Sequence, residues 1–288
     1  MTRHRRLVVV AIAVGLGGAV FAQTVDPQAL QRMVSTERAF AASALELGVR
    51  DSFLTYFADD AIALQPGADG AHAIVAPAKD GIRHLMQPIL PLTSQLMWAP
   101  FTGQVSSDGS LGWLTGAYTN FSVLARDVTG HGAYFSVWKR QPDNTWRVWL
   151  DEGITLPQLW DNASPFRVAP DPDAGTAGAA GETFDAAEAA VATGGEAWQQ
   201  RLGRDVRLHR NGQMPYVGRE AVLDWAKTAW PAPHYAVART LLAASDDLGV
   251  ALGGYDLAPA EHGIWARVWK RDVTGRWRIV FETSQPAQ

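Results

Sequence analysis

The sequence predicts an α+β protein made of two tandem cone-shaped domains, each a curved antiparallel sheet with helices over its concave face. Two observations predict this class. In each half of the chain, segments with helical periodicity come first and long alternating strands follow, which is the element order of an α+β domain. The second half also repeats the first, because residues 131–152 and 262–283 align without a gap.

The internal repeat extends beyond this hairpin. Further matched segments keep the same order in both halves: residues 107–118 with 245–255, and 53–67 with 198–212. The repeat is far longer than the unit of a solenoid, so we interpret it as the tandem duplication of a whole domain. We expect a first domain at 23–154, a linker rich in Pro, Ala and Gly at 155–181, and a second, diverged domain at 182–288.

The N-terminus has the features of a secretory signal peptide. Arg3, Arg5 and Arg6 precede an uncharged run from Leu7 to Val20, and small residues follow. That run is too short to favour a membrane-spanning helix, which needs about 20 apolar residues. We therefore expect residues 1–22 to be cleaved after Ala22 and the mature protein to be periplasmic or secreted, with no membrane contact after signal removal.

Composition excludes several classes of partner and chemistry. The chain has no cysteine, so disulfides, thiolate metal sites and cysteine nucleophiles are excluded. Its net charge of −4, without a basic cluster in the mature part, argues against nucleic acid as a partner. The histidine spacings do not match metal-binding motifs, and we expect no metal and no cofactor. Folding then depends on apolar burial, for which 47% hydrophobic residues and 12 tryptophans are ample.

Local patterns place the elements of the first domain in order. An amphipathic helix begins near Asp26 and ends at Gly48, with apolar residues at Leu30, Met33, Val34, Phe40, Ala41, Ala44 and Leu45. A short helix around 53–57 and a brief strand after Asp60 follow. A further short helix is expected at 81–87, with its counterpart at 218–229. The three long strands are predicted at 104–124 (interrupted after 108), 131–140 and 146–152.

Four segments carry a resemblance to a known family: ERAFAASALELGVRDSFLTYFADDAIALQPG, LMWAP, SSDGSLGWLTGAY and GHGAYFSVWKRQPDNTWRVWLDEG. Together they resemble the nuclear-transport-factor-2-like superfamily, in particular its SnoaL-like branch. The resemblance covers most of residues 30–154, and over 182–284 it rests mainly on the internal repeat. It implies a cone-shaped fold that often dimerises through its sheet. It also implies activities ranging from isomerases, cyclases and dehydratases to binding modules, so it does not choose a function.

Alternation along the 131–152 hairpin predicts two faces. One face is expected to carry Phe135, Val137, Val148 and Leu150, and the other Tyr134, Ser136, Trp138, Arg147, Trp149 and Asp151. The second half repeats the division, with Ala266, Val268, Ile279 and Phe281 opposite Trp265, Arg267, Trp269, Arg278 and Glu282. A change of one residue in register would mix these faces.

The candidate catalytic residues are Asp151, Tyr134 and His131. A carboxylate enclosed by aromatic rings has a raised pKa and suits proton transfer, and a nearby phenol can donate a hydrogen bond to a developing enolate oxygen. The alternative is that Asp151 pairs with Arg147 on a solvated or inter-domain face. His131 is a possible base, or a strand-end histidine bonded to a loop.

The candidate ligand-binding residues are aromatic and charged side chains, most of them at repeated positions: Trp113, Tyr118, Trp138, Tyr255, Trp265, Arg267 and Glu282. Core packing is the alternative role for the tryptophans.

The preferred hypothesis is an exported protein that binds a small apolar or aromatic molecule in one or both domains. The alternative is a cofactor-independent isomerase, cyclase or lyase with a pocket carboxylate as its general base. Sheet-to-sheet pairing predicts an internal pseudo-dimer or a homodimer.

Overall fold

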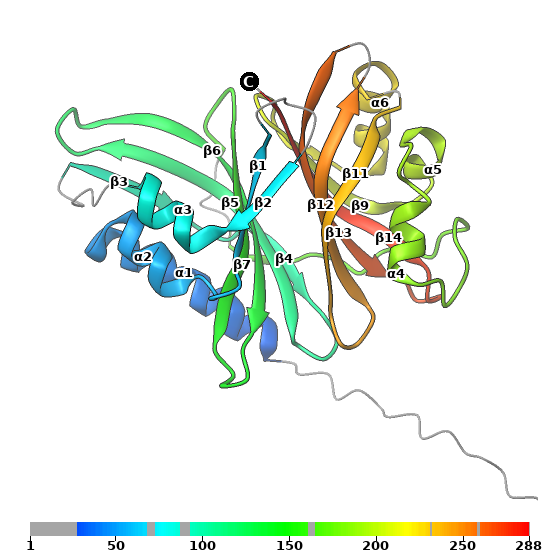
Figure 1. The fold of residues 1–288 in the computed structure, drawn as a ribbon, viewed down its shortest axis with the longest axis horizontal. Coiled ribbons are helices and arrows are strands. Elements are labelled where there is room, and N and C mark those ends of the chain that lie inside the picture. Colours follow the sequence, from blue (N-terminus) through cyan, green and yellow to red (C-terminus); the bar gives the residue numbers. More distant parts are fainter. Residues whose placement is uncertain are drawn as a thin grey trace, which may run out of the picture.

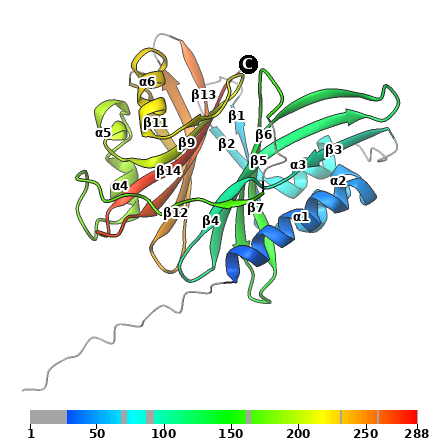
Figure 2. The same cartoon turned by 180° about the vertical axis from the view of Figure 1, so that it is seen from behind.

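Two curved sheets lie back to back in the computed structural model, and helices cover the outer face of each sheet (Figures 1 and 2). The structure describes residues 28–67, 73–86, 93–160, 165–230, 232–257 and 260–287. The signal peptide predicted at residues 1–22 lies outside this part of the chain. None of the helices in the described ranges is both long and apolar enough to span a bilayer.

The first half of the chain contains three helices and eight strands in the described ranges. They are α1 (Ala29–Leu47), α2 (Val49–Tyr56), β1 (Ile62–Pro66), β2 (Ala73–Pro77), α3 (Ala78–Leu85), β3 (Ser94–Trp98), β4 (Thr102–Val105), β5 (Leu111–Ser122), β6 (Asp127–Arg140), β7 (Trp146–Thr155) and β8 (Arg167–Val168). The sheet order is β7-β6-β5-β4-β8, and β3 also pairs with β5. Strands β1 and β2 form a separate hairpin.

The second half has a similar plan. It contains α4 (Phe184–Ala189), α5 (Gly195–Gln199), β9 (Leu202–Arg210), β10 (Tyr216–Val217), α6 (Arg219–Ala229), β11 (His234–Leu242), β12 (Leu248–Leu257), β13 (Glu261–Arg271) and β14 (Trp277–Pro286). The sheet order is β10-β9-β14-β13-β12-β11. The pairings are antiparallel except for β14 with β9. The predicted fold class of two tandem α+β cones is thereby confirmed.

The helices pack on the sheets through their apolar stripes. Met33, Phe40 and Ala44 of α1 are buried, and Met33 and Phe40 face the first sheet in a cluster with Leu114, Trp138, Trp146 and Val148. Helix α1 ends at Gly48, which has φ of 84°. This left-handed backbone is one that glycine adopts without strain, as expected for the residue that ends the helix.

The faces turned away from the helices form a core that both sheets share. Trp113 of β5 lies 5.2 Å from Phe281 of β14, measured between ring centroids. The same cluster contains Val250 and Val268 of the second sheet. It also contains Ile62 and Leu64 of the β1–β2 hairpin, so this hairpin of the first half packs at the interface with the second.

A β-bulge interrupts the long hairpin in both halves. Val137 pairs with Leu150 but Trp138 pairs with Val148, so Trp149 is an extra residue on β7. The second half has the same irregularity, with Val280 as its extra residue. The predicted alternation is therefore wrong beyond the bulge: Val148 and Ile279 lie on the helix side, and Trp149 and Val280 lie between the sheets. A bulge shifts the alternation by one residue.

The segment between the halves runs along the protein surface and is held by hydrogen bonds. Residues Arg167–Val168 form β8, which pairs in parallel with β4. The side-chain amide of Gln104 donates to the carbonyl oxygens of Ala169 and Pro170 at 2.9 and 3.0 Å. The segment 155–181, which has the composition typical of a linker, thus includes a short strand of the first sheet. Its first residue, Thr155, is the last residue of β7. The domain boundaries themselves stay a prediction.

Candidate functional site

The first half holds a pocket of about 190 Å³ on the helix side of its sheet. Strands β3, β5, β6 and β7 and helix α2 form its walls through Phe53, Leu96, Trp98, Tyr118, Asn120, Tyr134, Asp151 and Gly153. Most of this lining is aromatic or aliphatic, and a few polar groups converge in it. Such a combination is typical of pockets that bind small molecules.

Two of the predicted catalytic residues, Asp151 and Tyr134, meet in this pocket. Cross-strand pairing of Ser136 with Asp151 and of Tyr134 with Gly153 places both side chains on one face. The Asp151 carboxylate forms no hydrogen bond or ion pair with any residue that the structure describes. Arg147, the alternative partner, instead donates to the carbonyl oxygen of Thr55. Burial and the nearby charges of Glu37 and Glu152 raise the pKa of Asp151 well above its usual value.

The hydroxyl of Tyr134 is a second unsatisfied group in the pocket. The residue is 5% exposed, and its hydroxyl oxygen is buried without a hydrogen bond of good geometry in the described structure. Burial raises the pKa of Tyr134 well above its usual value, and the charges of Glu37 and Asp151 add to the effect. Glu37 is near enough to interact weakly with this hydroxyl. Buried polar groups are nearly always well paired, so a poorly paired hydroxyl that lines a pocket indicates a place for a ligand atom.

Glu37 of α1 lies behind the pocket and was not among the predicted site residues. Its side chain is 0% exposed and accepts hydrogen bonds from Trp98 Nε1 at 2.6 Å, Trp138 Nε1 at 2.9 Å and Ser136 Oγ at 3.2 Å. Burial raises the pKa of Glu37 to about 7, although these donors favour the ionised form and act against the rise. A sequence signal was present, because the spacing of Met33, Glu37, Phe40 and Ala44 places this glutamate on the apolar stripe of the helix.

The corresponding space in the second half is occupied by Arg267. This residue is 0% exposed and forms ion pairs with Glu188 at 3.2 Å and with Glu282 at 3.1 Å. Glu282 also accepts hydrogen bonds from Trp198 Nε1 at 2.9 Å and from the hydroxyl of Tyr235 at 3.0 Å. The predicted ligand-binding residues Arg267 and Glu282 therefore neutralise each other within the protein.

Two further predicted residues of the second half are also engaged within the protein. Trp265 is buried and donates from Nε1 to the carbonyl oxygen of Gly254 at 2.7 Å. The hydroxyl of Tyr255 donates to Glu261 at 2.9 Å and accepts from Arg210. Both side chains thus have the packed role that was the alternative to ligand binding.

Three predicted site residues of the first half do not line its pocket. His131 lies on the face of β6 that carries Ala133 and Phe135, opposite the face of Tyr134, so it cannot act with Asp151. Trp113 lies in the core between the sheets. Trp138 is fully buried and holds Glu37 from behind the pocket. By contrast, Tyr118 lines the pocket as expected, and partial burial raises its pKa.

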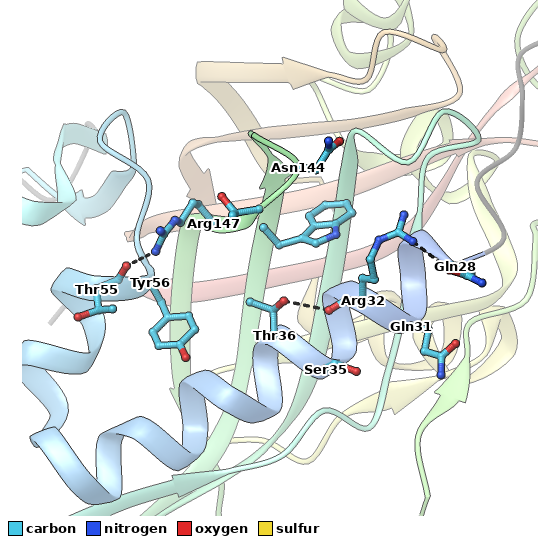
Figure 3. A pocket seen from close by; sticks show the side chains of 11 residues that line it. Gln28, Gln31, Arg32, Ser35, Thr36, Thr55, Tyr56, Asn144 and Arg147 are labelled. Atoms are coloured by element: carbon cyan, nitrogen blue, oxygen red, sulfur yellow. Dashed lines mark hydrogen bonds between the residues drawn. The ribbon is translucent and has the colours of Figure 1, made fainter. Parts of the chain in front are cut away.

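A larger hollow of about 750 Å³ lies between α1 and the β6–β7 turn, and it is an open polar groove (Figure 3). In Figure 3 the guanidinium of Arg147 points toward Thr55, and Arg32 lies beside Gln28 on α1. None of the carboxyl groups with raised pKa values lines this groove. Its size alone does not make it the better candidate, because its lining side chains are mostly polar, whereas binding pockets are mostly apolar.

Fold and site together define a class: a pair of helix-covered cones, of which the first has an open, largely apolar pocket with a carboxyl group at its polar end. Solved structures similar to the chain include a ketosteroid isomerase-like protein from Erwinia carotovora atroseptica, 12% identical, with 32% of this chain and 80% of that chain covered and a TM-score of 0.27. An NTF2-like protein from Cytophaga hutchinsonii is 14% identical, with 32% of this chain and 81% of that chain covered and a TM-score of 0.26.

A third similar structure is an NTF2-like protein with a cystatin-like fold from Novosphingobium aromaticivorans. It is 13% identical, with 35% of this chain and 73% of that chain covered and a TM-score of 0.24. Proteins of the kind that the sequence resembles are thus found among its structural neighbours. Neither a protein-family model nor a curated protein sequence matches the chain.

Proposed function

We propose that the pocket of the first half binds a small, largely apolar or aromatic molecule through its rings, with a polar group of that molecule bonded to Tyr134 and Asp151. The observation that carries this proposal is the buried Tyr134 hydroxyl, which lacks a hydrogen bond of good geometry, beside the unpaired and partly exposed carboxylate of Asp151 in a largely apolar pocket. A ligand atom in hydrogen-bonding contact with the Tyr134 hydroxyl removes the cost of leaving that group buried and unpaired.

The test is a binding screen of the mature protein by thermal shift and calorimetry, with benzamide and benzyl alcohol as neutral aromatic probes. We expect saturable binding that weakens in Tyr134→Phe and is lost in Gly153→Leu, which fills the pocket. An added Cβ at Gly153 meets its nearest atom, in the Tyr118 ring, at 3.6 Å, so a side chain can start here without a clash at its Cβ. Tyr216→Phe, in the second half, is the control. Binding that survives Gly153→Leu would place the ligand elsewhere and refute the proposal.

A specific observation also favours a second function, proton transfer by Asp151. A carboxyl group with a raised pKa is a stronger base in its ionised form than an ordinary carboxylate, so it is suited to accept and return a proton, and general acid–base catalysis contributes roughly 10²- to 10⁴-fold in rate. Tyr134 would donate a hydrogen bond to the substrate oxygen. Exchange of the α-protons of phenylacetone in D₂O, followed by NMR, tests this function. We expect exchange that Asp151→Asn abolishes. No exchange above that of buffer would leave binding as the sole function.

We further propose that the protein acts outside the cytoplasm. The support is the basic and then apolar composition of residues 3–22. Expression of the full chain in a bacterial host, followed by fractionation and N-terminal sequencing, is the test. The protein is expected in the periplasmic or secreted fraction with Gln23 as its first residue. A cytoplasmic protein that keeps Met1 would contradict the proposal.

A further inference from the structure

The two halves place the same kinds of side chain around the helix side of their sheets. By alignment of the repeat, Tyr118 corresponds to Tyr255, Tyr134 to Trp265, and Asp151 to Glu282. By strand pairing, Trp98 corresponds to Tyr235, because each lies opposite one of the matched tyrosines. The helix glutamates correspond as well, since Glu37 accepts from Trp138 and Glu188 accepts from the matching Trp269 at 2.6 Å.

One position in this arrangement differs in charge. Arg267 in the second half corresponds to Ser136 in the first, and each lies opposite the acidic residue of the neighbouring strand. Each also contacts the helix glutamate of its own half at 3.2 Å, Arg267 through its guanidinium and Ser136 through its hydroxyl. The same arrangement of side chains therefore contains a cationic residue in the second half and a neutral one at the matching position of the first half.

The guanidinium of Arg267 has two kinds of contact. It is an ion-pair partner of Glu188 and Glu282, and its Cζ lies 4.1 Å from the ring centroid of Tyr235 and 4.2 Å from that of Trp265. Cations are attracted to the faces of aromatic rings, and the attraction is strongest where water is excluded. A buried cation is thus stabilised by two carboxylates and two rings.

The first half keeps the carboxylates and the rings but has Ser136 in place of the arginine, and the basic residue whose charge acts on Tyr134 is Arg38 of α1. Neither Glu37 nor Asp151 forms an ion pair with another described residue, and the matching rings Trp98 and Tyr134 line the pocket of about 190 Å³. Burial of two carboxyl groups without a counter-charge is costly, which the raised pKa values of both groups reflect. Asp151, which lines the pocket, lies directly opposite Ser136 on the neighbouring strand, where the second half has the long side chain of Arg267.

We propose that the pocket of the first half binds a small organic cation, an amidinium, guanidinium or ammonium group on a short apolar body. The charged head lies against Trp98 and Tyr134 and pairs with Asp151, in the place that the Arg267 guanidinium takes in the second half. The apolar body contacts Phe53 and Leu96. This inference rests on the proposed binding function and specifies the chemical class of its ligand.

The test compares benzamidine, a cation, with benzamide, its neutral isostere, by calorimetry on the mature protein. We expect benzamidine to bind about tenfold tighter or more, because an ion pair and a desolvated cation–π contact are added. Asp151→Asn should remove most of this preference, whereas Asp143→Asn, in the exposed β6–β7 turn, should keep it. Equal affinity for the two probes would refute the proposal of a cationic ligand but leave the proposed binding function standing. No binding of either probe would refute both proposals.

A second variant tests the same inference without removing a carboxylate. Ser136→Arg introduces into the first half the guanidinium that the second half already has, and we expect it to abolish benzamidine binding. Ser136→Ala, which adds no charge, should retain binding within about threefold. Circular dichroism and the melting temperature show whether each variant is folded. If folded Ser136→Arg bound benzamidine as tightly as the unmodified protein, the proposed position of the cation would be wrong.

Discussion

Phe135 and Phe281 stack face to face across the two halves of the protein, with ring centroids 4.5 Å apart and an interplanar angle of 17°. Both side chains are almost fully buried. His209 packs against the same Phe281 ring edge to face at 4.8 Å. The interface between the sheets thus has the packing of a protein core, and its loss should affect the whole molecule.

Truncation of this contact tests the role of the shared core. Phe281→Ala is expected to lower the free energy of unfolding by about 3–5 kcal/mol, because it removes a buried ring and leaves a cavity. Urea denaturation followed by circular dichroism measures the change. Val273→Ala, at a turn residue that is 87% exposed, is the control and should change stability by less than about 0.5 kcal/mol. A loss below about 1 kcal/mol for Phe281→Ala would mean that the sheets do not share a core in solution.

The oligomeric state provides a second prediction. The sheet faces through which related cones are expected to pair are covered here by the other half of the same chain. We therefore expect the mature protein to be a monomer in light scattering at micromolar concentration. A stable dimer whose two halves tumble independently in NMR relaxation would contradict the internal pairing.

The pH dependence of stability depends in part on Glu37. Its pKa is about 7 in the folded protein and 4.5 in the unfolded chain, so the native state keeps a proton that the unfolded state loses between these values. The free energy of unfolding should therefore fall as the pH rises from 4.5 to 7. The contribution of Glu37 to the free energy of unfolding is fully present below pH 4.5. About 3 kcal/mol of this contribution is lost above pH 7.

The variant Glu37→Gln should reduce this slope, as measured by denaturation at a series of pH values. Some slope should remain, because burial also raises the pKa values of Asp151 and Glu152. Glu46→Gln changes an exposed residue of the same helix and is the control. If the slope of Glu37→Gln equalled that of the unmodified protein, Glu37 would not be protonated on folding in this range.

Close packing at Gly132 leads to a fourth prediction. A Cβ at this position would lie 1.9 Å from the carbonyl oxygen of Ile154 and 2.5 Å from the Tyr118 ring. Gly132→Ala should lower stability by on the order of 2 kcal/mol or more and displace Tyr118 at the pocket. In Gly81→Ala, within α3, the new Cβ meets nothing within 4 Å, so this control should be neutral or slightly stabilising. Equal melting temperatures for the two variants would contradict the packing at Gly132.

The sequence predicted the fold class and the positions of the long strands, because alternation and helical periodicity are local properties. It also placed Asp151 and Tyr134 on one face. This succeeded because both residues lie on the side of the bulge that is farther from the β6–β7 turn, where the predicted register holds. It failed for Val148, Trp149 and Ile279, because a bulge depends on how two strands pair and leaves no mark in the alternation of either one. Glu37 was missed because a single glutamate in a helix usually faces solvent.

The difference between the two cones, a buried arginine in one and a pocket in the other, depends on tertiary contacts. Sequence patterns therefore could not predict it. Arg267 was predicted to bind a ligand and was placed on the same face of the hairpin as Trp265 and Glu282. Its guanidinium instead reaches Glu188 on α4, a helix far away in the sequence. Only the folded arrangement shows that one arginine both completes the core of its own half and indicates what is missing from the other.

The hairpin β1–β2 contributes to the core that the two halves share. It belongs to the first half by sequence, but Ile62 and Leu64 are buried in a cluster with Leu248 and Val250 of the second sheet. A polypeptide that stopped after either half would present a broad apolar surface to water and would be prone to aggregate. Two such fragments produced together have complementary surfaces, so they could restore the native protein by association, whereas transplanting the first cone alone into another protein would require a substitute for its neighbour.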